Sequence, residues 1–157
     1  MSMDVGKVGL PGYSEFNGQT FTMEGEGHDV GGTDDSFHFA YAPMTGDGTI
    51  TARVVRPMSS QWTKPGVMMR ETLAADSRHA SMLLLPHWSG ALVTRSKKGG
   101  ETTTNKARHL GEKHVIKKNR LSTPYWLRLI RFRNRFTGYM SADGYNWKDL
   151  GSVEIPM

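Results

Sequence analysis

The sequence predicts an all-β protein built from two packed antiparallel sheets. Three observations predict this class: short apolar runs alternate with polar residues at a period of two, turn-forming residues separate the runs, and no helical period extends beyond about two turns. The chain has 18 glycines and seven prolines in 157 residues, so turn-forming residues are frequent. A chain of this length normally forms one domain around one core. We therefore expect a single β-sandwich domain over residues 1–157.

The clearest strand pattern lies in the C-terminal third of the chain. From residue 125 onward, Leu127 and Leu129 alternate with Trp126 and Arg128, which assigns the two pairs to opposite faces of a strand. Residues 136–141 then form a returning strand, and Val153 and Ile155 continue in strand phase. We expect three consecutive antiparallel strands whose reversals lie at Arg133-Asn134 and at Asp143-Gly144, since Asp-Gly tolerates positive φ.

Shorter runs predict the remaining strands. Residues 79–85 are nearly all apolar, which predicts a strand covered on both faces. In residues 37–41 three aromatic side chains fall on one face, and in residues 49–56 the alternation directs Ile50 inward with Ala52 and Val54. Further strands are expected over residues 20–24, 67–73, 91–95 and 114–117, after an extended lead-in over residues 4–17.

Charge is distributed unevenly along the chain. Residues 95–135 contain 13 lysines and arginines against two acids, whereas the remainder contains seven bases and 13 acids. Such a segment is typical either of a solvated loop or of a surface for an anionic partner. With no cysteine, the chain has neither disulfides nor thiolate metal sites. No apolar run is long enough for a membrane span, and the first residues lack the features of a signal peptide.

Seven segments, taken in order, carry a resemblance to a known family. They are DVG (residues 4–6), GEGHDV (25–30), DSFHF (35–39), GDGTITARV (46–54), GVMMRE (66–71), YWLRL (125–129) and SADGYNW (141–147). Together they resemble the bacterial concanavalin A-like (jelly-roll, laminin-G-like) β-sandwich domains of the lectin/glucanase superfamily. The subgroup is uncharacterised and occurs as stand-alone proteins and as accessory modules of secreted carbohydrate-active proteins. The sequence departs from the pattern at Gly31, where an aromatic residue is frequent, and in its basic stretch over residues 97–118.

The resemblance implies a two-sheet jelly roll and a glycan ligand. It also implies an extracellular or periplasmic location, with a cytoplasmic one left open, and a possible fusion to a larger carbohydrate-active protein. Because one fold supports many functions, the ligand has to be argued from the site.

Aromatic and arginine side chains form the candidate glycan site. Trp62 and Trp88 lie in loops beside proline and glycine, where an indole can serve as a platform for a sugar ring or can fold back over the end of the sandwich. Trp126 and Trp147 match the family motifs and are expected to pack internally. Four polar residues on different strands, together with Tyr125 from a matching segment, complete the candidate set: Arg70, Arg95, Arg128 and Tyr139. These four form either one polar patch or a structural network in which a buried arginine pairs with Glu71 or an aspartate.

Asp29, Asp34 and Asp35 crowd a glycine-rich loop and form a candidate calcium site. The alternative is that these aspartates cap turns through backbone amides. The histidines show no zinc spacing, and the sequence shows no Ser–His–Asp motif. Glu24 and Glu26 superficially resemble a glycosidase pair, but glycines flank Glu26 and end the strand.

The function expected from these observations is a non-catalytic, lectin-like carbohydrate-binding domain for a polysaccharide. The basic segment favours an acidic one. A glycoside hydrolase or lyase of the same fold is the enzymatic alternative, and a nucleic-acid or heparin-binding domain is a less expected one. No RNA- or DNA-binding module signature accompanies the basic residues.

Overall fold

The computed structural model describes residues 1–55, 62–85, 89–106 and 124–157. Within these ranges the chain forms β-strands, turns and loops and contains no helix, and every strand pairing is antiparallel. The prediction of an all-β antiparallel protein is therefore confirmed for this part of the chain. Among the described residues no helix is long and apolar enough to cross a membrane.

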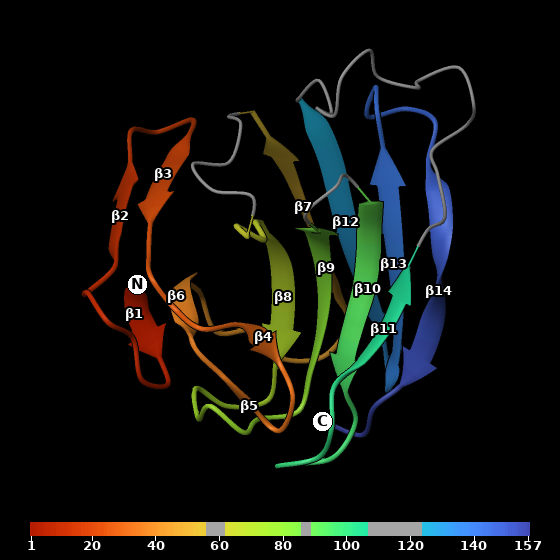
Figure 1. Ribbon diagram of the computed structural model, residues 1–157. Helices are drawn as coiled ribbons and strands as arrows, with labels where there is room; N and C mark the ends of the chain where they lie inside the picture. The colour runs from red at the N-terminus through yellow and green to blue at the C-terminus, as the bar shows by residue number, and fades with distance from the viewer. Residues whose placement is uncertain (56–61, 86–88, 107–123) are drawn as a thin grey trace.

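Two four-stranded sheets dominate the molecule (Figure 1). We call the first the covered sheet. Its strands follow one another in space as in the chain, and they are β8 (Gly66–Arg70), β9 (His79–Leu85), β10 (Ser89–Arg95) and β11 (Thr103–Lys106).

We call the second the open sheet. β14 (Lys148–Glu154), β13 (Arg135–Ser141) and β12 (Tyr125–Phe132) form a meander, and β7 (Gly48–Val54) pairs with β12. β7 and β12 are neighbours although the whole covered sheet lies between them in the chain. The spatial order of the open sheet is thus that of a continued meander, with the covered sheet inserted in the connection between the neighbouring strands β7 and β12.

Side chains from both sheets meet in one apolar core. The alternation expected at the start of β12 is confirmed, since Leu127 and Leu129 are fully buried while Trp126 and Arg128 are only half-buried. Removing each such leucine from water contributes about 1.5–3 kcal/mol. Ile50 lies in phase with Ala52 and Val54 and pairs with the buried Leu129, in agreement with its expected inward orientation, but it is 38% exposed, and only Ala52 and Val54 of that strand pack on the core. The core comprises Val67, Met69, Ala80, Met82, Leu84, Leu92, Tyr125, Leu127, Leu129, Phe136, Met140 and Ile155.

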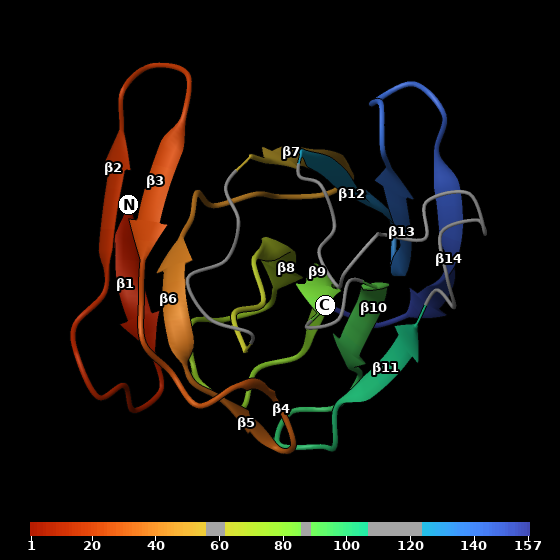
Figure 2. The ribbon, with the colours of Figure 1, turned by 45° about the horizontal axis from the view of Figure 1, so that its top comes forward.

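The N-terminal 40 residues form three small two-stranded sheets beside the covered sheet (Figure 2). The extended lead-in expected over residues 4–17 instead contains two short strands. The pairs are β1 (Ser2–Val5) with β6 (Phe37–Ala40), β2 (Tyr13–Phe16) with β3 (Phe21–Glu24), and β4 (Val30–Gly31) with β5 (Asp34–Asp35).

This N-terminal segment explains why the covered sheet is buried on both faces. Val30 packs against Leu83, Ala91 and Val93, whose side chains point away from the main core. As predicted from its composition, β9 is buried along nearly its whole length.

The two reversals expected in the C-terminal third are present. Arg133 adopts a left-handed conformation (φ 54°) between β12 and β13, and Gly144 does so (φ 82°) between β13 and β14. Asp143 Oδ1 accepts the backbone N–H groups of Tyr145 and Asn146, each at 2.8 Å, which fixes the second turn.

Candidate functional site

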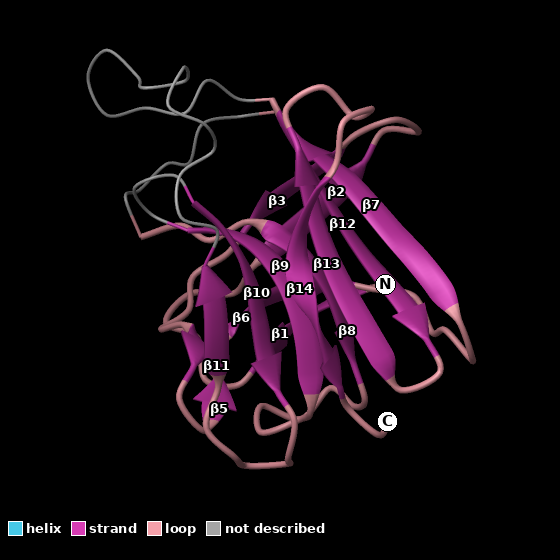
Figure 3. Ribbon diagram, turned by 90° about the vertical axis from the view of Figure 1, so that its right-hand side faces the viewer, coloured by secondary structure: helices cyan, strands magenta, loops and turns pink. Residues whose placement is uncertain are grey.

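The outer face of the open sheet carries a cluster of aromatic and arginine side chains. Because Leu127 points into the core, its neighbours Trp126 and Arg128 project from the opposite face. Arg128 pairs in register with Thr51 on β7 and with Tyr139 on β13, so these three form one row across the sheet. Figure 3 shows the strands of the open sheet side by side.

The centre of this cluster is a stacked pair of Arg128 and Trp147. The guanidinium carbon of Arg128 lies 3.7 Å from the centroid of the Trp147 ring, and Arg128 Nε donates to Thr51 Oγ1 at 3.1 Å. The indole is fixed in turn, since Trp147 Nε1 donates to the Gly144 carbonyl at 3.0 Å. Both groups are therefore held in place before any ligand arrives.

Trp126 occupies a second position on the same face. The guanidinium carbon of Arg53 lies 5.8 Å from its ring centroid. The turn at Gly144 also packs against this ring, since a Cβ there would lie 3.0 Å from Trp126 Cε2. Gly144 thus has two reasons to be glycine, its positive φ and this close approach.

Tyr145 is the most exposed aromatic side chain of this region, at 88%. It stands in the turn that Asp143 organises, directly before the residues that lead into β14. Four hydrogen bonds from the turn and from Ser141 lower the pKa of the Asp143 carboxyl, with the side chain of Asn146 contributing most. The carboxylate therefore stays ionised and the turn stays ordered at neutral pH.

The predicted platform Trp62 lies at the same end of the molecule as Tyr145. Trp62 is 71% exposed and precedes β8, whose first residue pairs with Leu83 near the end of β9. Gly90, at the start of β10, packs so closely on Met140 that a Cβ would lie 2.4 Å from its sulfur, so this end of the covered sheet meets the end of β13. Trp88 lies outside the described residues.

We define the outer-face site as the residues that these observations bring together: Arg53, Trp126, Arg128, Tyr139, Tyr145 and Trp147. Arg128 and Tyr139 were expected from the sequence. Trp126 and Trp147 were expected to pack internally, and both are half-buried on the outer face instead. The phase of Trp126 against Leu127 was the signal that could have found it, whereas nothing in the sequence singled out Tyr145.

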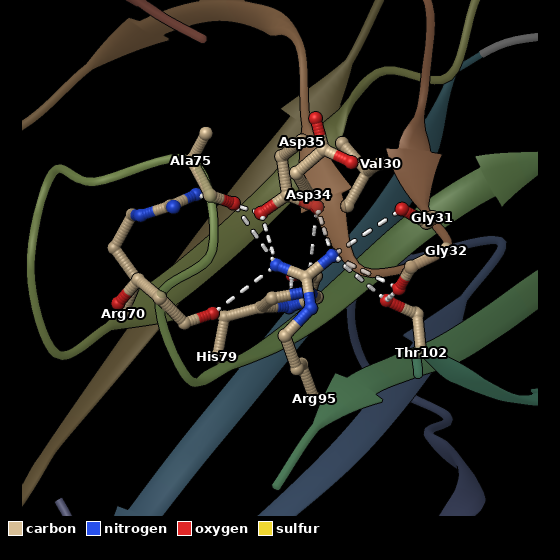
Figure 4. Close-up of polar contacts among 12 residues, drawn as sticks. Val30, Gly31, Gly32, Asp34, Asp35, Arg70, Ala75, His79, Arg95 and Thr102 are labelled. Carbon is tan, nitrogen blue, oxygen red and sulfur yellow. Dashed lines mark hydrogen bonds and ion pairs between the residues drawn. The ribbon is translucent and has the colours of Figure 1, made fainter. Parts of the chain in front are cut away.

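Arg70 and Arg95 belong to a different, buried cluster (Figure 4). Arg95 is fully buried and forms a two-pronged ion pair with Asp35, with Nη1 to Oδ2 at 2.9 Å and Nη2 to Oδ1 at 2.8 Å. Arg70 reaches the same carboxylate at 3.3 Å. The remaining N–H groups of Arg95 are used by the Thr102 hydroxyl and by the carbonyls of Gly31, Gly32, Ala75, Ser77 and Gly100.

These contacts correct part of the candidate set. With every donor engaged and no exposed surface, Arg95 acts as a structural link and is not available to a ligand. Arg70 shares this environment, and burial lowers the pKa of its guanidinium while Asp35 opposes that effect. Tyr125 lies in the core, where burial raises the pKa of its hydroxyl. Of the alternatives left open by the sequence, the structural network describes Arg70 and Arg95.

His79 completes the buried cluster. Its Nδ1 lies 2.9 Å from Ser81 Oγ, and its Nε2 has no hydrogen-bond partner, at 3.9 Å from Asp35 Oδ1. Burial, with the charges of Arg95 and Arg70, lowers the pKa of His79 to about 3. The imidazole is therefore neutral at physiological pH.

The three aspartates of the candidate calcium site do not converge. Asp35 is engaged by Arg95 and Arg70, and Asp29 forms an ion pair with Lys64 and accepts the Val30 amide at 2.6 Å. Asp34 is exposed. The part of the chain that the structure describes contains no group of three or more histidine, aspartate or glutamate residues that could hold a metal ion.

The residues of the hydrolase alternative lie at the end of the β2–β3 hairpin and just after it. β3 ends at Glu24, as the flanking glycines predicted, and both Glu24 and Glu26 are exposed.

Comparisons with protein-family models, with curated proteins and with solved structures found no match for the chain.

Proposed function

We propose that the protein is a lectin-like carbohydrate-binding domain of the concanavalin A-like, jelly-roll class, and that its glycan lies across the outer-face site. The observation that carries the proposal is the stacked pair of Arg128 and Trp147, with Tyr139 in register with Arg128 and the exposed Tyr145 two residues before Trp147 in the chain. The two antiparallel four-stranded sheets, which face each other across one apolar core, support the fold class.

The chemistry of the site suits a sugar. Pyranose rings present apolar C–H faces, which pack on aromatic rings, and hydroxyl groups, which need directed hydrogen bonds. Tyr145 and Trp147 offer rings, and Arg128 and Tyr139 offer donors on the same surface. Because Thr51 and Trp147 already hold the Arg128 guanidinium, binding a glycan there loses little side-chain entropy.

Arg53 and Arg128 extend the proposal to acidic glycans. A planar guanidinium can donate two parallel hydrogen bonds to a carboxylate such as that of a uronate. Both arginines lie beside indoles on the outer face, at 5.8 Å and 3.7 Å from the ring centroids. A polysaccharide that carries carboxylates along its length would meet a cation at two neighbouring positions.

The experiment is an affinity-electrophoresis panel of neutral and acidic polysaccharides, followed by titration calorimetry on those that retard the protein. We expect Tyr145→Ala and Arg128→Ala each to weaken binding by about tenfold, which corresponds to about 1.4 kcal/mol. Phe132→Ala is the matched control, because Phe132 is also an exposed aromatic residue (59%) but lies at the opposite end of β12. The control is expected to bind as the wild type does.

The same panel separates the alternatives. Release of new reducing ends would favour the hydrolase, and retention by nucleic acid or heparin with a steep fall in affinity on adding salt would favour a general polyanion site. Failure of the wild-type protein to bind any polysaccharide, or equal losses in Tyr145→Ala and Phe132→Ala, would overturn the proposal.

A further inference from the structure

A hydrogen-bonded chain of serine, histidine and aspartate lies in the N-terminal segment, away from the open sheet. The Ser14 hydroxyl is 2.8 Å from His38 Nε2, and His38 Nδ1 is 2.7 Å from Asp4 Oδ1. The three residues come from β2, β6 and β1, and Asp4 and His38 stand directly opposite each other in the β1–β6 pair. The sequence showed no such motif because only strand pairing brings the three together.

The direction of the hydrogen bonds follows from the chemistry of the groups. An ionised carboxylate can only accept, so Nδ1 of His38 must donate to Asp4. In the neutral imidazole this leaves Nε2 as an acceptor, and the Ser14 O–H must donate to it. This is the arrangement in which an imidazole can withdraw the proton of a hydroxyl nucleophile.

The histidine is held tightly from both sides. A Cβ on Gly12 would lie 2.2 Å from His38 Cγ and Nδ1, and a Cβ on Gly25 would lie 2.5 Å from His38 Cβ. Only glycine fits at these two positions, and the His38 side chain is 5% exposed. The ring therefore has no room to turn away from Ser14.

Asp4 is also fixed in its role. Its two carboxylate oxygens accept the Gly12 amide at 3.1 and 3.2 Å in addition to His38. The hydrogen bond from His38, and then that from Gly12, lower the pKa of Asp4. The carboxyl therefore stays ionised at neutral pH and orients the imidazole.

The serine opens onto an apolar surface. Ser14 pairs with Met23, and Phe16 pairs with Phe21 two residues further along the hairpin, so all four side chains lie on one face. The two phenylalanine rings stack with centroids 4.5 Å apart, and the three apolar side chains are all exposed. In Figure 2 this β2–β3 hairpin extends beyond the end of β1, at the edge of the molecule.

We propose that Ser14, His38 and Asp4 form a nucleophile, a general base and its positioning residue, and that they cleave carboxylic esters whose apolar part lies on the Met23–Phe16–Phe21 surface. In the first step Ser14 Oγ bonds to the ester carbonyl carbon and its proton passes to His38 Nε2. The bond from that carbon to the alcohol oxygen breaks, and the alcohol leaves with the proton from Nε2. Water then attacks the acyl-serine with His38 as base, releasing the acid and restoring Ser14.

The competing explanation is that the Ser14–His38–Asp4 hydrogen bonds only stabilise the packing of the β2–β3 hairpin on the β1–β6 pair. A structural role needs the two hydrogen bonds but no reactive hydroxyl, so covalent modification of Ser14 distinguishes the two explanations. The proposal is also independent of glycan binding, because the outer-face site shares no residue with it.

The test combines a fluorophosphonate probe with hydrolysis of 4-nitrophenyl butyrate by the full chain. We expect the probe to modify Ser14, located by peptide mass spectrometry. Ser14→Ala should abolish labelling at position 14 and lower hydrolysis by about 10²-fold. Labelling and hydrolysis are expected to fall by about 10²-fold in His38→Gln and by about tenfold in Asp4→Asn. Ser96→Ala is the control, because Ser96 is an exposed serine outside the cluster, whereas Ser14 is half-buried, and it should retain the wild-type rate.

The role of Asp4 has its own readout. Asp4→Asn should shift the pH profile of labelling while Ser14 remains the modified residue, which loss of a structural role alone would not do. Near-ultraviolet circular dichroism checks the folding of each variant. Identification of the labelled residue in the wild-type protein tests the proposal even if a variant fails to fold. An unlabelled Ser14 in folded wild-type protein, or equal hydrolysis by wild type and Ser14→Ala, would overturn the proposal and leave the structural role.

Discussion

Both sheets carry arginines on their outer faces, but the arginines of the two sheets differ in burial and in their partners. On the covered sheet, Arg70 and Arg95 are sealed beneath the N-terminal segment and bound to Asp35. On the open sheet, Arg128 and Arg53 lie against the faces of tryptophan rings at the surface. All four arginines point away from the main core, so the difference comes from whether another layer of the protein covers the sheet.

The two environments make opposite demands on a guanidinium. Beneath a protein layer, the loss of hydration is offset only if every N–H finds an acceptor, and Arg95 has eight such contacts with seven residues. At the surface, water supplies those acceptors and the ring contributes about 0.5–1 kcal/mol. The buried arginines thus serve stability, whereas Arg53 and the half-buried Arg128 lie where a ligand can replace water.

Removing the shared carboxylate should have the largest effect. Asp35→Ala leaves two guanidinium groups buried without a counterion, so we expect the free energy of unfolding to fall by about 3–5 kcal/mol. Urea denaturation followed by tryptophan fluorescence measures it. Asp34→Ala is the matched control, since Asp34 is an exposed neighbour and should lose less than about 0.5 kcal/mol. Equal losses in the two variants would contradict the account of the covered sheet.

Acid should weaken the covered sheet through His79. Its pKa of about 3 lies below the usual 6.5, so between these two pH values His79 is protonated in the unfolded chain and neutral in the folded protein. The sign is therefore a loss of stability as the pH falls from about 6.5 toward 3, by up to about 1.4 kcal/mol per pH unit. His79→Gln should flatten the difference between pH 6.5 and 5 in urea titrations. If the free energy of unfolding of the variant kept the same slope against pH, the pH dependence would arise from other groups.

The turn of the open sheet should respond moderately to Gly144→Ala. A Cβ at φ 82° is strained, and it would also press on Trp126 at 3.0 Å, so we expect a loss of about 1–2 kcal/mol. Thermal unfolding measures the loss, and the emission of Trp126 should shift because its packing changes. Gly46→Ala serves as the comparison, since Gly46 has a similar φ of 76° with nothing within 4 Å of the added atom. Gly46→Ala should lose less stability than Gly144→Ala, and the difference measures the cost of the contact between the added Cβ and the indole of Trp126.

The smallest change in stability is expected for Arg128→Lys, a substitution that can also be made at Arg95 on the covered sheet. Arg128→Lys keeps the charge and loses the planar stack on Trp147, so stability should change by less than about 1 kcal/mol. The same substitution at Arg95 should cost several times more, because one ammonium group cannot replace a two-pronged pair with Asp35. Similar values for the two lysine variants in denaturant titrations would remove the distinction drawn between the faces.

Much of the fold could be predicted because its signals are local. Strand β9 was predicted with its exact bounds, since a continuous apolar run has few other interpretations. The meander of β12, β13 and β14 followed from alternation and two turns. The short strands β1 and β2 escaped prediction because four residues among glycines and prolines leave no period to recognise.

The site was less predictable because it depends on contacts distant in the chain. Arg95 and Arg128 occupy similar alternating positions, and only the pairing with Asp35, 60 residues away, separates the fully buried one from the half-buried one. The Ser14–His38 contact likewise spans 24 residues and requires three strands to meet. By contrast, the outward position of Trp126 was present in its phase against Leu127.

The Asp35 ion pair also bears on how the chain reaches its native state. The strands of the covered sheet are joined by short connections and can associate early, whereas Asp35 must arrive from a segment far upstream. If the covered sheet forms first, we expect the positive charges of Arg70 and Arg95 to keep its outer face hydrated and to repel other copies of the chain. The arginines that pair with Asp35 in the native protein would therefore also oppose aggregation of the partly folded chain.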